Sequence, residues 1–169
     1  MTIEKLDTRK LFADLDKTTT SFILLLDVAN ENMLDIIPFE NSWTVAQVAS
    51  HVTKSNKAIA QGLQMQGQPA ERNADENVEK LKKFFLDYKA KYQSPEFILP
   101  TQKKYSKKEV ITKLQDSVNM LKSLRDKTDL SEMITLPGLG EITKFEMLNF
   151  VVFHTKRHTR QLKNIMQHF

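Results

Sequence analysis

The sequence predicts an all-α fold, an antiparallel four-helix bundle with extra short helix or loop segments. Only four glycines and five prolines interrupt the 169 residues, which favours long helices over a turn-rich β fold. Apolar residues recur at spacings of three and four over several long stretches. Ser or Thr followed three positions later by Glu or Gln marks three helix starts. At this length we expect a single domain that spans residues 1–169.

The first two helices are predicted in the N-terminal part of the chain. The first runs from about Thr8 to Asn30, where apolar residues form one stripe with a period of 3.6. A break at residues 37–41 contains a proline. Thr44 and Gln47 then form a T-x-x-Q capping box that opens the second helix, and the Gly and Pro of residues 67–69 end it.

Three more helices are predicted after a polar linker. The third covers about Asn77 to Tyr92, and the apolar segment 94–100 that follows should pack across the bundle. Ser106 and Glu109 form an S-x-x-E capping box that opens a helix to about Asp126. Residues 136–140 predict a turn, with a short hairpin as the alternative. A T-x-x-E box opens the last helix, over about 143–167.

Composition excludes several classes of protein and site. The chain has no cysteine, which excludes disulfides and cysteine-ligated zinc and fits a cytoplasmic location. The charged N-terminal segment 1–7 does not resemble a secretory signal. The apolar run Phe22–Leu26 is far shorter than the roughly 20 residues of a membrane span. Lysines at 80–91 and 103–127 are mixed with acidic residues, so these segments, in a chain with a formal charge of +4, predict solvated helix faces, with no nucleic-acid or membrane partner.

The histidines give the strongest functional signal. His154 and His158 are four residues apart on the last predicted helix, so both imidazoles project from one face. That face also carries Leu148, Val151, Leu162 and Ile165, which places the two rings toward the protein interior. His51 lies on the apolar side of the second predicted helix. Three neutral imidazoles from two helices would form an open site for a divalent metal ion, zinc or nickel, and the alternative is ordinary buried histidines with hydrogen-bond partners.

Residues near these histidines have simpler expected roles. Gln161, one turn after His158, could accept a hydrogen bond from an imidazole. Trp43 is expected to anchor the start of the second helix, and Arg157 to be an exposed charge near a helix C-terminus. The fourth histidine, His168, is expected at the surface.

Two segments together resemble the DinB/YfiT-like superfamily. Residues 42–51, Ser-Trp-Thr-Val-Ala-Gln-Val-Ala-Ser-His, look like its W-[ST]-x-x-[EQ]-x-x-x-H motif, and residues 154–162 look like its H-x-x-[KR]-H motif followed by Arg-Gln-Leu. The resemblance implies a four-helix bundle with up-down-down-up wiring. It also implies a divalent metal ion, usually zinc or nickel, on His51, His154 and His158. The superfamily includes thiol S-transferases, a maleylpyruvate isomerase and many proteins described as metal-dependent hydrolases.

The sequence therefore supports two classes of function. The first is a metal-dependent enzyme with a small-molecule substrate, either a hydrolase or a low-molecular-weight thiol S-transferase, in which water or thiolate takes the open metal position. The alternative is a non-enzymatic metal-binding or interaction module. No Asp or Glu is placed convincingly as a general base, so catalytic residues stay unassigned. A homodimer through an exposed helix face is also expected.

Overall fold

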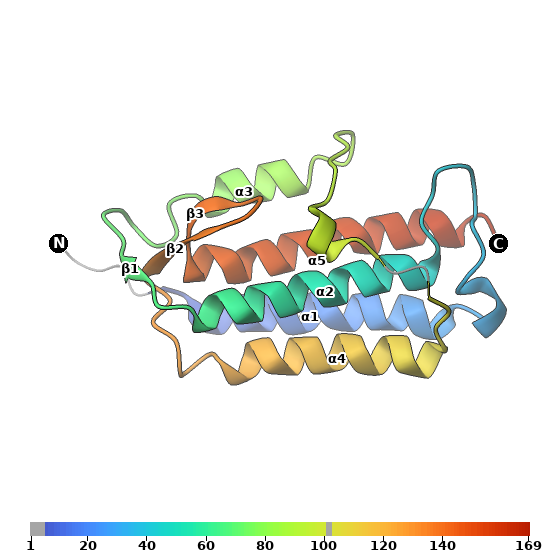
Figure 1. The fold of residues 1–169 in the computed structure, drawn as a ribbon, viewed down its shortest axis with the longest axis horizontal. Helices are drawn as coiled ribbons and strands as arrows, with labels where there is room; N and C mark the ends of the chain where they lie inside the picture. Colours follow the sequence, from blue (N-terminus) through green and yellow to red (C-terminus); the bar gives the residue numbers. More distant parts are fainter. Residues whose placement is uncertain (1–5, 101–102) are drawn as a thin grey trace.

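Four long helices dominate the computed structural model, which describes residues 6–100 and 103–169 (Figure 1). Each helix packs against two others, in the order α1, α4, α2, α5 around the bundle. The mainly helical bundle predicted from the sequence is therefore confirmed. The first five residues, part of the segment judged not to be a secretory signal, lie outside the described residues. The four helices are α1 Thr8–Val28, α2 Val45–Gln64, α4 Lys107–Ser123 and α5 Lys144–Met166.

A small antiparallel sheet at one end of the bundle shows that the all-α prediction was incomplete (Figure 1). Its strands are β1 Gln68–Pro69, β2 Glu132–Leu136 and β3 Gly140–Thr143, hydrogen-bonded in the order β1-β2-β3. Gly138 in the turn and Gly140 at the start of β3 have φ angles of 80° and 69°, a region that glycine enters without strain. The hairpin, which the sequence allowed as the alternative to a plain turn, is thus present.

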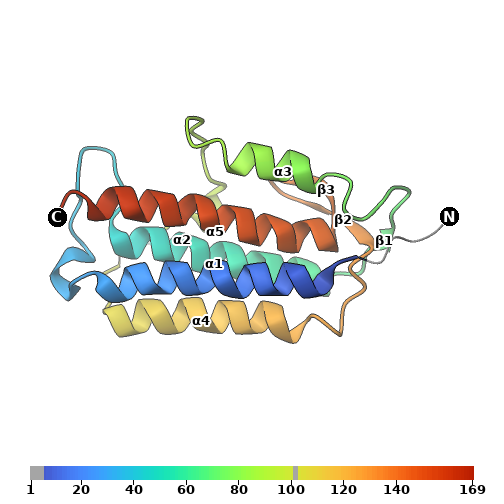
Figure 2. The same cartoon turned by 180° about the vertical axis from the view of Figure 1, so that it is seen from behind.

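The third helix, α3, is shorter than predicted. It spans Val78–Phe85 and packs on the outside of α5 (Figure 2), whereas the sequence pattern placed its end near Tyr92. Arg157 on α5 explains the difference, because its guanidinium donates to the carbonyls of Phe85 (3.2 Å) and Asp87 (2.9 Å) and also to that of Ala90. These carbonyls take their hydrogen bonds from Arg157 instead of from a further helical turn.

Local capping was predicted correctly for two of three helix starts. In α2, Thr44 and Gln47 form both bonds of the capping box, and the equivalent pair at the start of α5 does the same. In α4 only the Ser106 half forms, with its Oγ accepting from the amide of Glu109 at 3.1 Å. The Glu109 carboxylate instead bonds Lys103 and Lys113, so the predicted box at this helix is wrong in its second half.

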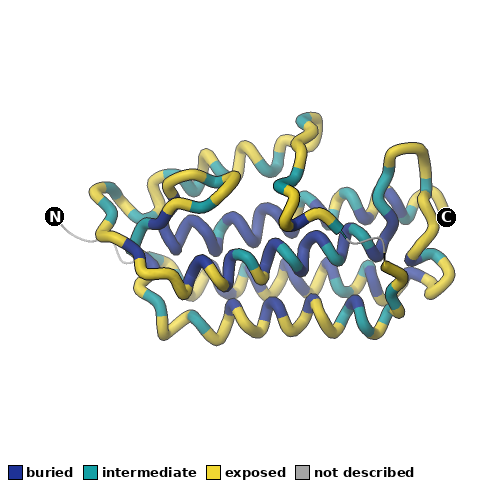
Figure 3. Tube along the Cα trace, viewed as in Figure 1, coloured by how far each residue is buried: buried dark blue, intermediate teal, exposed yellow. Residues whose placement is uncertain are grey.

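A buried polar layer divides the core between two apolar clusters. Buried positions recur along all four long helices (Figure 3). One cluster joins the start of α1 and α5 to the end of α2 and α4, and the other joins the opposite ends. Along each helix, polar side chains lie between or at the border of the two clusters. Within this layer Asn56 of α2 donates to the Ser117 hydroxyl of α4 at 3.1 Å. The buried members of the layer are Thr18, Thr19, His51, Thr53, Ser55, Asn56, Ser117, His154, Thr155 and His158.

A buried carboxylate fixes the start of α5. Glu146 is fully buried, and its two oxygens accept from the Arg72 guanidinium at 2.6 and 2.7 Å and from the amides of Asn77 and Thr143 at 2.8 and 3.0 Å. Burial alone would raise the pKa of this carboxyl, but the Arg72 ion pair and the two amides outweigh it and hold the pKa below its ordinary value. Glu146 therefore ties the loop before α3 to the start of α5.

Glu146→Gln should destabilise the fold by about 2–3 kcal/mol, because it leaves the Arg72 guanidinium without its carboxylate and replaces an acceptor oxygen with a donor. Urea unfolding at pH 7 measures the change in the free energy of unfolding. Glu79→Gln, at an exposed residue of α3 with only a loose Lys82 contact, is the matched control and should change stability by less than about 0.5 kcal/mol. Equal effects of the two substitutions would contradict the assigned role of Glu146.

Candidate metal centre

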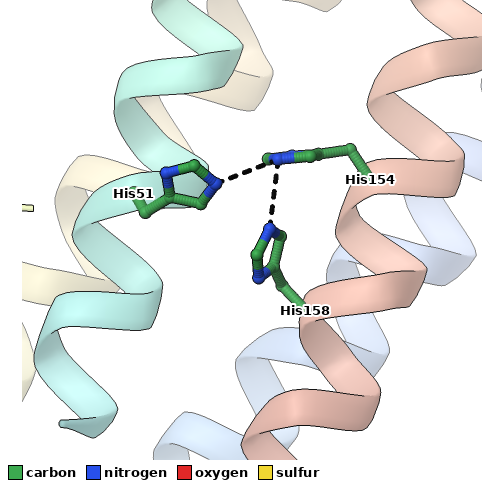
Figure 4. A group of neighbouring side chains, drawn as sticks. All are labelled: His51, His154 and His158. Carbon is green, nitrogen blue, oxygen red and sulfur yellow. Dashed lines mark hydrogen bonds between the residues drawn. The ribbon is translucent and has the colours of Figure 1, made fainter. Parts of the chain in front are cut away.

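The structure brings the three predicted histidines together at the middle of the bundle (Figure 4). His51 comes from α2, and His154 and His158 come from successive turns of α5. The Nε2 atom of His154 lies 3.0 Å from that of His51 and 3.1 Å from that of His158. The three candidate ligand atoms all lie within 4.8 Å of one another, close enough to bind one ion.

Burial keeps the three imidazoles neutral. His51, His154 and His158 are only 1%, 5% and 8% exposed. Loss of solvent lowers the pKa of each ring, that of His154 to well below its ordinary value and that of His158 to about 3. Each neutral imidazole has one N–H donor and one bare nitrogen, which is the form that binds a metal ion.

Two hydrogen bonds decide which nitrogen is bare. His51 donates through Nδ1 to the carbonyl of Ile98 at 2.8 Å, since a carbonyl can only accept. His158 donates through Nδ1 to the Gln161 side-chain oxygen at 2.7 Å. Both rings therefore carry their proton on Nδ1 and direct a bare Nε2 toward His154 (Figure 4).

The donor set fits a divalent ion better than it fits a closed hydrogen-bond network. The Nε2 atom of His154 faces two bare nitrogens, but a neutral ring has a single proton to offer. Its Nδ1 atom is buried and has no partner within residues 6–100 and 103–169. Tetrahedral zinc with bonds of about 2.0–2.1 Å places neighbouring nitrogens roughly 3.3 Å apart, close to both measured separations.

Aromatic rings surround the histidines. Phe150 stacks on His154 with ring centroids 5.0 Å apart, and Phe85 approaches the same ring edge-on at 6.2 Å. Trp43, expected only as an anchor for α2, is half-buried and lies 5.0 Å from the His51 ring and 6.4 Å from the His158 ring. Phe85 and Phe150 therefore pack on the His154 ring, whereas Trp43 lies on the side of the His51 and His158 rings.

A cavity of about 1020 Å³ borders the centre on that side. Trp43 and His158 line it, together with the chain segment between α3 and η2 (Glu96–Ile98) and the C-terminal half of α5. In the part of the chain that the structure describes, no residue that lines this cavity is an Asp or a Glu. A ligand in the cavity would therefore reach the histidine cluster through His158, with no carboxylate beside it.

Comparison with known proteins identifies the family. The model of the DinB superfamily matches residues 14–162. The chain belongs to the DinB superfamily. A search of solved structures finds TT2238, described as a four-helix bundle protein, with a TM-score of 0.60 and 18% sequence identity over 92% of this chain and 98% of that one. No curated protein matches the sequence. Within the described part of this DinB-superfamily chain, no helix combines the length and apolarity that crossing a membrane needs.

Around the histidines of this superfamily member, some partners were predictable and others were not. Gln161 bonds His158, which the sequence allowed without favouring it, and His168 is exposed as predicted. The Ile98 carbonyl was missed; the sequence indicated only that its apolar segment packs on the bundle. Arg157 was expected as an exposed charge, but it is half-buried and holds three carbonyls of the segment after α3. The sequence signal for a partly buried Arg157 was its position about one helical turn after the inward-facing His154.

The metal-free protein should lose stability as the pH falls below about 6.5. The folded state depresses the pKa of the three buried histidines, so the unfolded chain binds more protons in this range and acid favours unfolding. Urea unfolding should show that the free energy of unfolding falls between pH 7.5 and pH 5, by roughly 1 kcal/mol per pH unit for His158, whose pKa in the folded state is about 3. His158→Gln should reduce this slope and His168→Gln should not. A flat profile would contradict the neutral buried cluster.

Proposed function

We propose that this protein binds a divalent metal ion, zinc or nickel, on His51, His154 and His158 and acts as a metal-dependent enzyme on a small molecule. The observation that carries the proposal is the convergence of three buried Nε2 atoms, two of them oriented by Nδ1 hydrogen bonds to Ile98 and Gln161. Three protein ligands leave one position free, as in catalytic zinc sites, whereas structural zinc sites close with four.

The ion would act as a Lewis acid and lower the pKa of a water or thiol that takes the free position. The chain itself supplies the orientation of two imidazoles, the aromatic walls and an approach through the cavity at His158. Both hydrolysis and thiol S-transfer are compatible with this arrangement. Because the chain has no cysteine, a thiol would have to come from a low-molecular-weight cosubstrate.

The absence of carboxylates around the cavity favours thiol transfer over hydrolysis. Hydrolases with a metal centre commonly use an Asp or Glu as general base. None of the residues that line this cavity, from the ranges 6–100 and 103–169, is acidic, and the buried Glu146 already accepts hydrogen bonds on both oxygens. A thiol bound to the ion needs no separate base to stay ionised.

The bundle would have the up-down-down-up wiring of the superfamily, which the order of colours along the four long ribbons in Figure 1 supports.

Elemental mass spectrometry on tag-free protein incubated with zinc or nickel should find about one metal ion per chain. His51→Ala and His154→Ala should each reduce this content to near zero, because two imidazoles alone hold a divalent ion weakly. His168→Ala is the matched control and should keep the metal. No metal in the wild type would refute the proposal. Full metal content with no turnover in a screen of thiols and electrophiles would favour the non-enzymatic alternative.

Gln161→Met should weaken metal affinity about 10- to 100-fold while the fold stays intact. Methionine keeps the length of the side chain but removes the oxygen that accepts from His158 Nδ1 and fixes the tautomer. Competition with a chromophoric zinc chelator measures the dissociation constant. Gln167→Met, at an exposed position two turns nearer the C-terminus, is the control. An unchanged affinity in Gln161→Met would show that the hydrogen bond does not orient the ligand.

A further inference from the structure

The cavity beside the histidines carries an unbalanced positive charge. Among the described residues, four cationic side chains line it and no acidic side chain does. Lys91 comes from the segment after α3, and Arg157, Arg160 and Lys163 follow one another at intervals of three residues on α5. A hollow lined by one sign of charge concentrates counter-ions of the other sign.

Two of these cations have donors available for a ligand. The guanidinium of Arg157 is already bonded to three backbone carbonyls. Arg160 lies with its guanidinium 4.6 Å from the centre of the Tyr88 ring, and in the part of the chain that the structure describes it makes no hydrogen bond or ion pair. Lys163, one turn further, likewise has no described carboxylate partner. The Tyr88 ring thus positions the guanidinium of Arg160 at the cavity wall, and the N–H groups of this guanidinium are available to a ligand.

The rest of the lining is aromatic, aliphatic and neutral polar. Trp43 and Tyr92 contribute ring surface, and Gln161 and Asn164 contribute amides. Trp43 also lies against the rings of two of the three histidines, so the apolar part of the cavity is the part nearest the metal centre. A matching ligand has an apolar body at Trp43 and a negative group toward Arg160 and Lys163.

We propose that this cavity binds a small organic anion, whose carboxylate or phosphate ester contacts Arg160 and Lys163 and whose apolar body rests on Trp43. The cavity of about 1020 Å³ is large enough for a metabolite-sized molecule. The inference names the substrate class for the proposed metal-dependent function and rests on that function in placing the reacting group beside His158. The anion subsite itself consists of residues outside the histidine cluster.

Trp43 offers a direct readout, because it is the only tryptophan in the chain and lines the cavity. Zinc-loaded protein is titrated with phenylacetate, phenyl phosphate and neutral 2-phenylethanol while Trp43 fluorescence is followed. The anions should cause a saturable change and bind about tenfold or more tightly than the alcohol. Their affinity should fall as salt rises. The ratio between phenylacetate and phenyl phosphate assigns the anionic group as carboxylate or phosphate.

Arg160→Gln combined with Lys163→Gln should weaken binding of the preferred anion about tenfold or more and leave metal content unchanged. Lys57→Gln combined with Lys127→Gln removes the same charge at exposed positions outside the cavity and should leave the affinity unchanged. Circular dichroism and thermal unfolding confirm that both double variants fold. An equal loss of anion affinity in the two double variants would show that only the net charge matters and would overturn the proposed subsite.

The His154→Ala variant separates this inference from the proposed function. Anion binding that survives in His154→Ala but is lost in the Arg160/Lys163 variant supports the subsite. Anion binding that is lost in His154→Ala and unaffected in the Arg160/Lys163 variant places the anion on the metal alone and overturns it. Equal affinity for the alcohol and the anions also overturns it. A wild type without metal that still binds the anion refutes the metal function and leaves the subsite standing.

Discussion

The structure depends on burying three neutral imidazoles in one layer of a helical bundle. Polar groups lose their water when they are buried, so each nitrogen needs a partner. Ile98 and Gln161 supply partners for two Nδ1 atoms, and this leaves bare Nε2 atoms about 3 Å from a third. A single proton on His154 cannot satisfy both neighbours fully, whereas one divalent cation satisfies all three. The two apolar clusters on either side keep the layer in register, since neither cluster includes these polar groups.

The segment from the end of α3 to Leu99, which includes η2, orients one of the three histidines and does more than connect two helices. Its Ile98 carbonyl fixes the His51 tautomer, and Lys54 of α2 donates to the next carbonyl, of Leu99, at 2.6 Å. Arg157 of α5 holds the other end of the segment through three carbonyls and lies over the Tyr92 ring at 5.0 Å. Both helices that carry the histidines therefore also hold the chain that covers them. Movement of this segment would change the orientation of His51 and the shape of the cavity together.

The sequence predicted what depends on local periodicity and failed where distant residues decide. The i,i+4 spacing of His154 and His158 and the apolar side of α2 were enough to predict that the three histidines point inward. The end of α3 was wrong because the competitor for its last carbonyls, Arg157, is about 70 residues away in sequence. The Glu109 carboxylate accepts from two lysines instead of completing its capping box, and the local sequence pattern does not show which of these partners it prefers. The β1 strand forms by pairing with β2, far along the chain, and a strand of two residues has no recognisable sequence pattern of its own.

The positions of the acidic side chains bear most directly on whether a carboxylate can act as a base at the histidine cluster. Glu146 is the buried carboxylate on the same helix as two of the histidines, eight residues before His154, which is about 12 Å along the helix axis. Its oxygens are taken by Arg72 and by backbone amides, and its lowered pKa keeps it ionised as a structural group. Neither distance nor hydrogen bonding leaves it free to accept a proton at the centre. Within residues 6–100 and 103–169, the charged groups that line the approach are all cationic, so they can bind and orient an anion but offer no carboxylate to accept a proton from water. Under the proposed function, such a lining would suit a cosubstrate that ionises on the metal ion.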